Sequence, residues 1–182
     1  MAHQFTTSYV EDCISLLVYS KSTAERAMAQ IADEHLFATL DPESNSIGVI
    51  VKHMSGNMRS RWTDFLTSDG EKPNRDRDSE FEDPPATRAA VLDSWEAGWS
   101  CVFSALHALT DDDLPRTVII RGEPHSVMQA INRQLAHYSL HIGQIILLAK
   151  HYAGEKWQSL TIPRRASAEF NQRVLSGKAS QR

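Results

Sequence analysis

Residues 126–154 read SVMQAINRQLAHYSLHIGQIILLAKHYAG, and this stretch decides the fold. Ser126 and Gln129 have the spacing of a capping box, in which two side chains close the first turn of a helix. Apolar residues then recur at helical spacing up to Gly154, a residue type that commonly follows a helix end. These apolar positions are Val127, Ile131, Leu135, Tyr138, Ile142 and Ile145. The stretch therefore predicts one long amphipathic helix.

Three earlier segments show the same periodicity, each behind a capping residue. Ser8 with Glu11 begins the first, Ser46 the second and Thr87 the third. Four amphipathic helices with almost no strand signal predict an all-α fold, a four-helix bundle. With 182 residues, of which 41% are hydrophobic, the chain can bury one core and is too short for two ordinary domains. We therefore expect one helical domain over residues 1–182.

The connections are less regular. Residues 67–86 lose the helical periodicity, are rich in acidic side chains and predict a long loop between the second and third helices. Residues 116–122 are β-branched and short, so they predict a small strand or an extended connector. A short terminal helix is expected at residues 167–175. Trp62, Trp95 and Trp99 are interpreted as core or dimer packing.

Bulk properties exclude several classes of protein. A formal net charge of −4 with scattered basic residues argues against nucleic-acid binding. Cys13 and Cys101 lack the spaced partners of a disulfide framework or a cysteine zinc site. The longest apolar segment is far below the roughly 20 residues that a membrane span needs, and no leader pattern is found at the N-terminus. We expect a soluble cytoplasmic protein.

Polar residues occupy one side of the last helix, at Gln134, His137, His141 and Gln144. Their spacing directs them toward the bundle, where polar groups need partners. Histidines four residues apart lie one turn apart on a helix, so both rings can reach one cation. A pair that is merely hydrogen-bonded, without a metal, is the alternative at this point.

The second helix carries a matching polar row on the flank of its apolar face. At 100° per residue, its members lie within an arc of about 80°. They are His53, Asn57, Arg61 and Asp64. If the second and fourth helices are neighbours, His53 supplies a third nitrogen. None of the eight histidines follows a glutamate by three residues and none belongs to His-Glu-x-x-His, which leaves a mononuclear three-histidine candidate.

Four segments carry a resemblance to a known family. NSIGVIVKHMSGN at residues 45–57, followed by HYSLHIGQ at residues 137–144, resembles the metal triad of the DinB/YfiT-like superfamily. RWTDFLTSDGEKP at residues 61–73 and IRGEPH at residues 120–125 resemble one subfamily, known as a domain of unknown function. The resemblance covers nearly the whole chain.

The resemblance implies a DinB-like bundle, usually a homodimer, that holds one divalent metal through His53, His137 and His141. Superfamily members include S-transferases that use bacillithiol and isomerases that use mycothiol. Three imidazoles leave a coordination position open, as catalytic zinc sites do. Zinc or nickel is expected, with iron as a further option, since such sites accept several metals.

Three neighbouring residues are candidates to orient a ligand or to bind substrate. Asn57 and Gln144 lie about one turn from a histidine, although an ordinary polar rim explains them equally well. Arg61 has two candidate partners, a substrate carboxylate and Asp64, and our interpretation favours Asp64. The loop at residues 67–86 is either a cover for the metal pocket or a solvated surface loop.

These observations support three hypotheses about function. The first is a metal-dependent transferase that adds a low-molecular-weight thiol to a small electrophile. The second is a non-catalytic metal-binding or stress-response dimer, and the third is a metal-dependent hydrolase of small substrates. A homodimer is expected because apolar residues lie on additional flanks of the first and third helices. The alternative is that the 67–86 loop covers these flanks, which hold Val18, Tyr19, Leu92 and Phe103.

Overall fold

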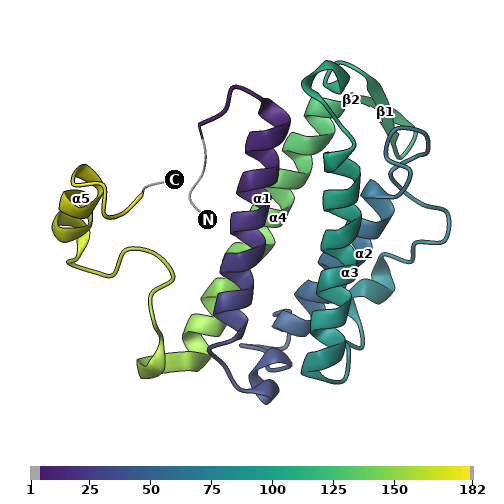
Figure 1. Ribbon diagram of the computed structural model, residues 1–182. Helices are drawn as coiled ribbons and strands as arrows, with labels where there is room; N and C mark the ends of the chain where they lie inside the picture. Colours follow the sequence, from purple (N-terminus) through teal and green to yellow (C-terminus); the bar gives the residue numbers. More distant parts are fainter. Residues whose placement is uncertain (1–4, 181–182) are drawn as a thin grey trace.

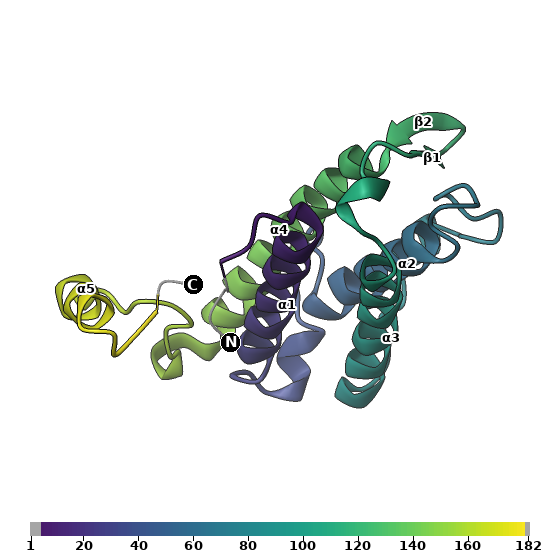
Figure 2. The ribbon, with the colours of Figure 1, turned by 45° about the horizontal axis from the view of Figure 1, so that its top comes forward.

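Four long helices form the bundle, with two pairs of closely packed neighbours (Figure 1). The computed structural model describes residues 5–180. The helices are α1 (Tyr9–Met28), α2 (Ile47–Trp62), α3 (Arg88–His107) and α4 (Val127–Ala153). Helix α1 packs on α4 and α2 packs on α3, and Figure 2 shows the same two pairs from another direction. Helices α2 and α4 also meet, which joins the pairs. The predicted all-α bundle is confirmed.

Each helix begins at the capping residue that the sequence indicated. The side chains of Ser8, Ser46, Thr87 and Ser126 accept hydrogen bonds from the backbone three residues ahead. Such a cap contributes about 1 kcal/mol because it satisfies an N–H that has no partner within the helix. At the other end of α4, Gly154 has a φ of +55°, a backbone conformation that costs glycine little. Local signals therefore define the helix ends.

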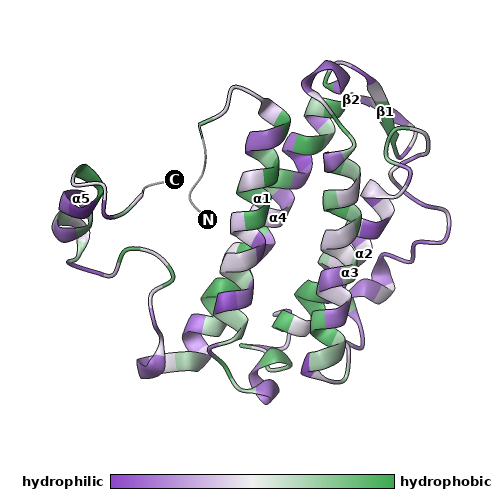
Figure 3. Ribbon diagram, in the orientation of Figure 1, coloured by the Kyte–Doolittle hydropathy of each residue, from purple (hydrophilic) through white to green (hydrophobic). Residues whose placement is uncertain are grey.

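The core contains large apolar side chains from all four helices. Trp95, Trp99 and Tyr138 are fully buried, and Trp62 is 3% exposed, so the interpretation of the tryptophans as core residues is confirmed. The indole Nε1 of Trp62 donates to the hydroxyl of Tyr138 at 2.9 Å, which fixes α2 against α4. Hydrophobic and hydrophilic residues alternate along each of these helices (Figure 3), as amphipathic packing requires.

A small antiparallel hairpin connects α3 to α4. Its strands are β1 (Thr117–Ile120) and β2 (Glu123–Ser126). The sequence left a small strand and an extended connector open for residues 116–122, and the structure shows a strand there. It gave no signal for the second strand, since Pro124 and the capping residue Ser126 conceal it. Asp69 accepts hydrogen bonds from the backbone N–H groups of Arg121 and Gly122, both at 2.8 Å. The hairpin turn is therefore tied to the loop that follows α2.

The loop at residues 67–86 packs along α2 and includes a short 3-10 helix, η2 (Asp78–Phe81). Lys52 of α2 donates to the carbonyl oxygens of Ser79 at 2.6 Å and Glu82 at 2.7 Å, which holds η2 in place. The alternative in which this loop covers the outer flanks of α1 and α3 is therefore wrong. It lies against α2 instead, where Glu80 of η2 contacts His53.

The flanks proposed for a dimer interface differ from each other. Val18 and Tyr19 of α1 are 39% and 48% exposed, whereas Leu92 and Phe103 of α3 are half-buried and pack against the core. The homodimer stays a prediction.

Three further 3-10 turns are η1 (Asp33–Leu36), η3 (Asp111–Asp113) and η4 (Gly154–Lys156).

The predicted terminal helix is present as α5 (Ser167–Leu175), at the end of a segment that leads away from the bundle (Figure 1). Within residues 5–180, the helices are too short or too polar to cross a membrane.

Candidate metal centre

Three histidine side chains from two helices converge on one point. His53 comes from α2, and His137 and His141 come from α4. The Nε2 atom of His137 lies 3.2 Å from Nε2 of His53 and 3.1 Å from Nε2 of His141. Two imidazole nitrogens bound tetrahedrally to one zinc ion at about 2.1 Å lie about 3.4 Å apart. The spacing of the three nitrogens is therefore close to that of a three-histidine metal site.

The hydrogen bonds at the opposite ring atoms determine which nitrogens face the centre. Nδ1 of His53 lies 2.9 Å from a carboxylate oxygen of Glu80, and Nδ1 of His141 lies 2.8 Å from the amide oxygen of Gln144. Both oxygens are acceptors, so each Nδ1 carries a hydrogen. In neutral rings, Nε2 then has a free lone pair. Two lone pairs therefore face His137, whose ring can donate to only one of them, and a cation would accept all three.

The environments of His137 and His141 favour neutral imidazoles, the form that binds metal. Burial, together with the neighbouring His141 and His53 rings, lowers the pKa of His137 from its usual 6.5 to about 3. Burial also lowers the pKa of His141, against the opposing effect of its hydrogen bond to Gln144. Burial and repulsion between protonated rings therefore keep His137 and His141 neutral, so that their lone pairs are free to bind a cation.

Acidification is expected to destabilise the metal-free protein between about pH 6.5 and pH 3. The pKa of His137 is lower in the folded than in the unfolded chain. The unfolded chain therefore binds more protons in this window, and the free energy of unfolding falls as the pH falls. Urea unfolding of chelator-treated protein at pH 7 and pH 5 measures the loss. His137→Gln should lose less stability over the same interval, and equal losses in both proteins would contradict the assignment.

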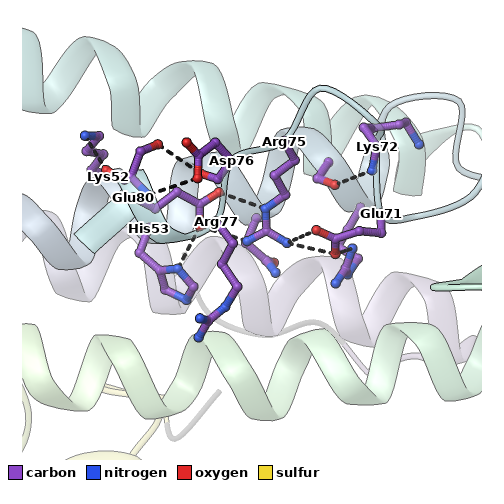
Figure 4. Close-up of polar contacts among 12 residues, drawn as sticks. Lys52, His53, Glu71, Lys72, Arg75, Asp76, Arg77 and Glu80 are labelled. Atoms are coloured by element: carbon purple, nitrogen blue, oxygen red, sulfur yellow. Dashed lines mark hydrogen bonds and ion pairs between the residues drawn. The ribbon is translucent and has the colours of Figure 1, made fainter. Parts of the chain in front are cut away.

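A buried acidic residue holds His53 in place. Glu80 of η2 is 5% exposed, accepts from His53 and makes two further contacts with Arg75, at 2.7 Å and 2.8 Å (Figure 4). Burial raises the pKa of Glu80, but the hydrogen bonds from His53 and Arg75 outweigh it and keep the pKa below its usual value. An ionised carboxylate on Nδ1 fixes the tautomer of a metal-binding histidine and increases its basicity. Phe81 packs against the same ring, with centroids 4.5 Å apart.

Sequence reasoning missed Glu80. Residues 68–83 contain seven acidic side chains, and nothing in their spacing distinguishes this one. The available signal was Gly56, a glycine inside a helix. A β-carbon at Gly56 would collide with the Glu80 carboxylate, so the glycine makes room for it.

The structure also shows where the three candidate orienting or substrate-binding residues lie. Asn57 is buried, and its Oδ1 accepts from the hydroxyl of Tyr138 at 3.3 Å. Gln144 is exposed, contrary to the inward direction predicted for it, but its amide oxygen orients His141. The favoured pairing of Arg61 with Asp64 is wrong. Arg61 forms an ion pair with Glu71 at 2.8 Å and donates to the carbonyl oxygen of Gly70.

Comparison with known proteins identifies the family of this chain. Residues 4–166 match the model of a family described as a protein of unknown function, DUF1572. The chain belongs to the DUF1572 family. A crystal structure of a DinB-like protein from Bacillus cereus ATCC 10987 is similar, with a TM-score of 0.61 and 17% identity. The similarity covers 81% of this chain and 94% of that one, and it shows that the fold is DinB-like. No curated protein matches the chain.

In this DUF1572 chain, a cavity of about 240 Å³ adjoins the triad. His53 and His137 line it, together with Asn57 and Gln134. A metal held by the three histidines would therefore be next to space that a small molecule can enter. Such an arrangement is typical of catalytic sites, whereas structural zinc sites use four protein ligands.

Proposed function

We propose that the protein binds one divalent transition metal through Nε2 of His53, His137 and His141. We further propose that it transfers a low-molecular-weight thiol to a small electrophile. The observation that carries the proposal is the convergence of three ring nitrogens, in which the lone pairs of His53 and His141 face a His137 ring that can donate to only one of them. Three imidazoles suit zinc or nickel, and iron(II) is also compatible with such ligands. When bound, the metal supplies a Lewis acid that keeps a thiol ionised at neutral pH.

The surrounding residues have separate tasks in this proposal. Glu80 holds the hydrogen on Nδ1 of His53, and Gln144 does the same for His141, so both rings keep Nε2 directed at the centre. Asn57 lines the cavity next to His53, where it would hydrogen-bond a substrate. The core packing of Trp62 and Tyr138 keeps α2 and α4 at a fixed separation, which the site requires because its ligands come from both helices.

The proposed activity is tested with a panel of thiols and a generic electrophile, 1-chloro-2,4-dinitrobenzene, followed by absorbance. Metal-loaded protein is expected to accelerate the reaction with at least one thiol. Chelator-treated protein and His141→Ala should show only the uncatalysed rate. His151→Ala is the matched control, because His151 is an exposed histidine on the same helix.

Other outcomes distinguish the competing functions. Metal-dependent cleavage of p-nitrophenyl acetate, without thiol transfer, would replace the transferase proposal with the hydrolase. No metal-dependent rate in either assay, for protein that has bound its metal, would replace it with the non-catalytic binding role.

A further inference from the structure

The cavity beside the triad has an unusual concentration of positive charge. In addition to His53, Asn57, Gln134 and His137, its lining contains five arginines and no acidic residue. The arginines are Arg61, Arg75, Arg77, Arg121 and Arg133. They come from α2, the loop at residues 67–86, the hairpin turn and α4. The whole chain has a formal net charge of −4, so the general charge balance does not explain this local excess.

Nearby carboxylates neutralise only part of this charge. Glu71 is shared by three guanidinium groups, those of Arg61 at 2.8 Å and of Arg75 and Arg121 at 3.2 Å. Glu80 forms a second ion pair with Arg75. Asp69, a half-buried carboxylate that also interacts with Arg61, adds a third negative charge. Five positive charges therefore face three buried or half-buried negative ones, which leaves a surplus of two.

Two of the arginines are poorly neutralised. The nearest carboxylate to Arg77 is Asp78, at 3.9 Å and with a side chain that is 95% exposed. Within residues 5–180, Arg133 has no ion pair. Figure 4 shows the Arg77 side chain extending from the residue before η2 past His53 toward α4. Arg77 lines the same cavity as His53 and His137. Its own neighbour is the ring of Phe81, 4.9 Å below the guanidinium carbon.

Buried polar atoms without partners provide a second observation. Nε of Arg61 and Oε1 of Gln134 are buried and make no hydrogen bond, and both residues line the cavity. Arg61 is 5% exposed and Gln134 is 4% exposed. Buried donors and acceptors are nearly always paired in native proteins, so unpaired ones at a cavity mark positions where a ligand or an ordered water completes the hydrogen bonds. An oxyanion would accept from Arg61, and a hydroxyl or amine beside it would donate to Gln134.

We propose that this cavity binds the carboxylate or phosphate group of a small acidic substrate. Guanidinium groups pair with both oxyanions through two parallel hydrogen bonds, which fixes orientation as well as charge. The statement that a bound molecule reacts at the triad rests on the proposed metal-dependent function. The anion site itself does not depend on that function. The arginines would thus select acidic molecules and hold them with one end toward the three histidines.

Isothermal titration calorimetry with inorganic phosphate and with malonate tests the proposal. Both are titrated into metal-loaded protein and into protein freed of metal and then desalted to remove the chelator. At least one anion is expected to bind at a single site in the metal-free protein. Arg77→Gln with Arg133→Gln, both exposed residues, should weaken that binding at least about tenfold, the range expected when charge-assisted contacts are lost. Arg173→Gln on α5 is the matched control and should bind as the unchanged protein does.

Each result has a defined meaning. Preference for malonate assigns a carboxylate substrate, and preference for phosphate assigns a phosphorylated one. Anion binding by the metal-free protein, together with no thiol-transfer activity in the metal-loaded protein, would retain the anion site and reject the proposed function. Circular dichroism checks that the double variant is still folded. If neither anion binds, or if the folded double variant binds as tightly as the unchanged protein, the anion site is overturned.

Discussion

His137→Ala is expected to abolish stoichiometric binding of a divalent metal. His137 is the central member of the triad, since its Nε2 lies within 3.2 Å of both other ring nitrogens. Its removal leaves two imidazoles, and the loss should exceed the roughly 10–100-fold that follows loss of a ligand-orienting partner. Elemental analysis after loading with zinc or nickel and desalting should find about one ion per chain in the unchanged protein and less than about a tenth of that in the variant.

The control and a second measurement make this result specific. His151→Ala removes an exposed histidine from the same helix and should keep the full metal content. A metal that binds only the folded chain also raises its melting temperature. The unchanged protein and His151→Ala should show that rise on metal addition, and His137→Ala should not. A full complement in the double variant His137→Ala with His141→Ala would disprove the three-histidine site.

The helices could be predicted from the sequence because their signals are local. Ser8, Ser46, Thr87 and Ser126 each cap the helix that follows, and a cap depends on residues within one turn. The pair His137 and His141 is local in the same sense, since four residues of helix place both rings on one face. The contribution of His53 required α2 and α4 to be neighbours. Which helices are neighbours is a property of tertiary packing, and local sequence patterns do not record it. The adjacency of α2 and α4 was therefore expected only from the family resemblance.

The residues that sequence reasoning missed depend on long-range or irregular structure. Glu80 reaches His53 from a loop 27 positions along the chain, and no periodicity records such a contact. Arg61 does not pair with Asp64 because α2 ends at Trp62. Pairing of residues three apart needs a continuous helix, whereas Thr63 is extended and Asp64 has a φ of +50°. The carboxylate that reaches Arg61 comes from the loop instead, at Glu71.

Glu80→Ala is expected to have a large effect on stability as well as on the metal site. The change leaves the buried Arg75 guanidinium without the carboxylate that contacts it at 2.7 Å and 2.8 Å. Removal of one partner from a buried ion pair costs about 3–5 kcal/mol when the remaining charge is uncompensated. Arg75 keeps its 3.2 Å contact with Glu71, which two other arginines share, so we expect a loss near the lower end of that range. Urea unfolding should show a loss of that order. Glu82→Ala changes an exposed glutamate two residues away and should lie within about 0.5 kcal/mol of the unchanged protein.

The same carboxylate should influence the metal without contacting it. Loss of Glu80 frees Nδ1 of His53, so the ring can rotate or move its hydrogen to Nε2, and metal affinity should fall about 10–100-fold. Gly56→Ala tests this effect with all charges retained, because its β-carbon would displace the Glu80 carboxylate from His53. Competition with a chromogenic chelator measures both variants. If metal affinity falls in Glu80→Ala but not in Gly56→Ala, the charge of Glu80 matters more than its position. If neither variant binds metal more weakly, Glu80 has only a structural task and His53 is oriented by the packing of α2 and Phe81.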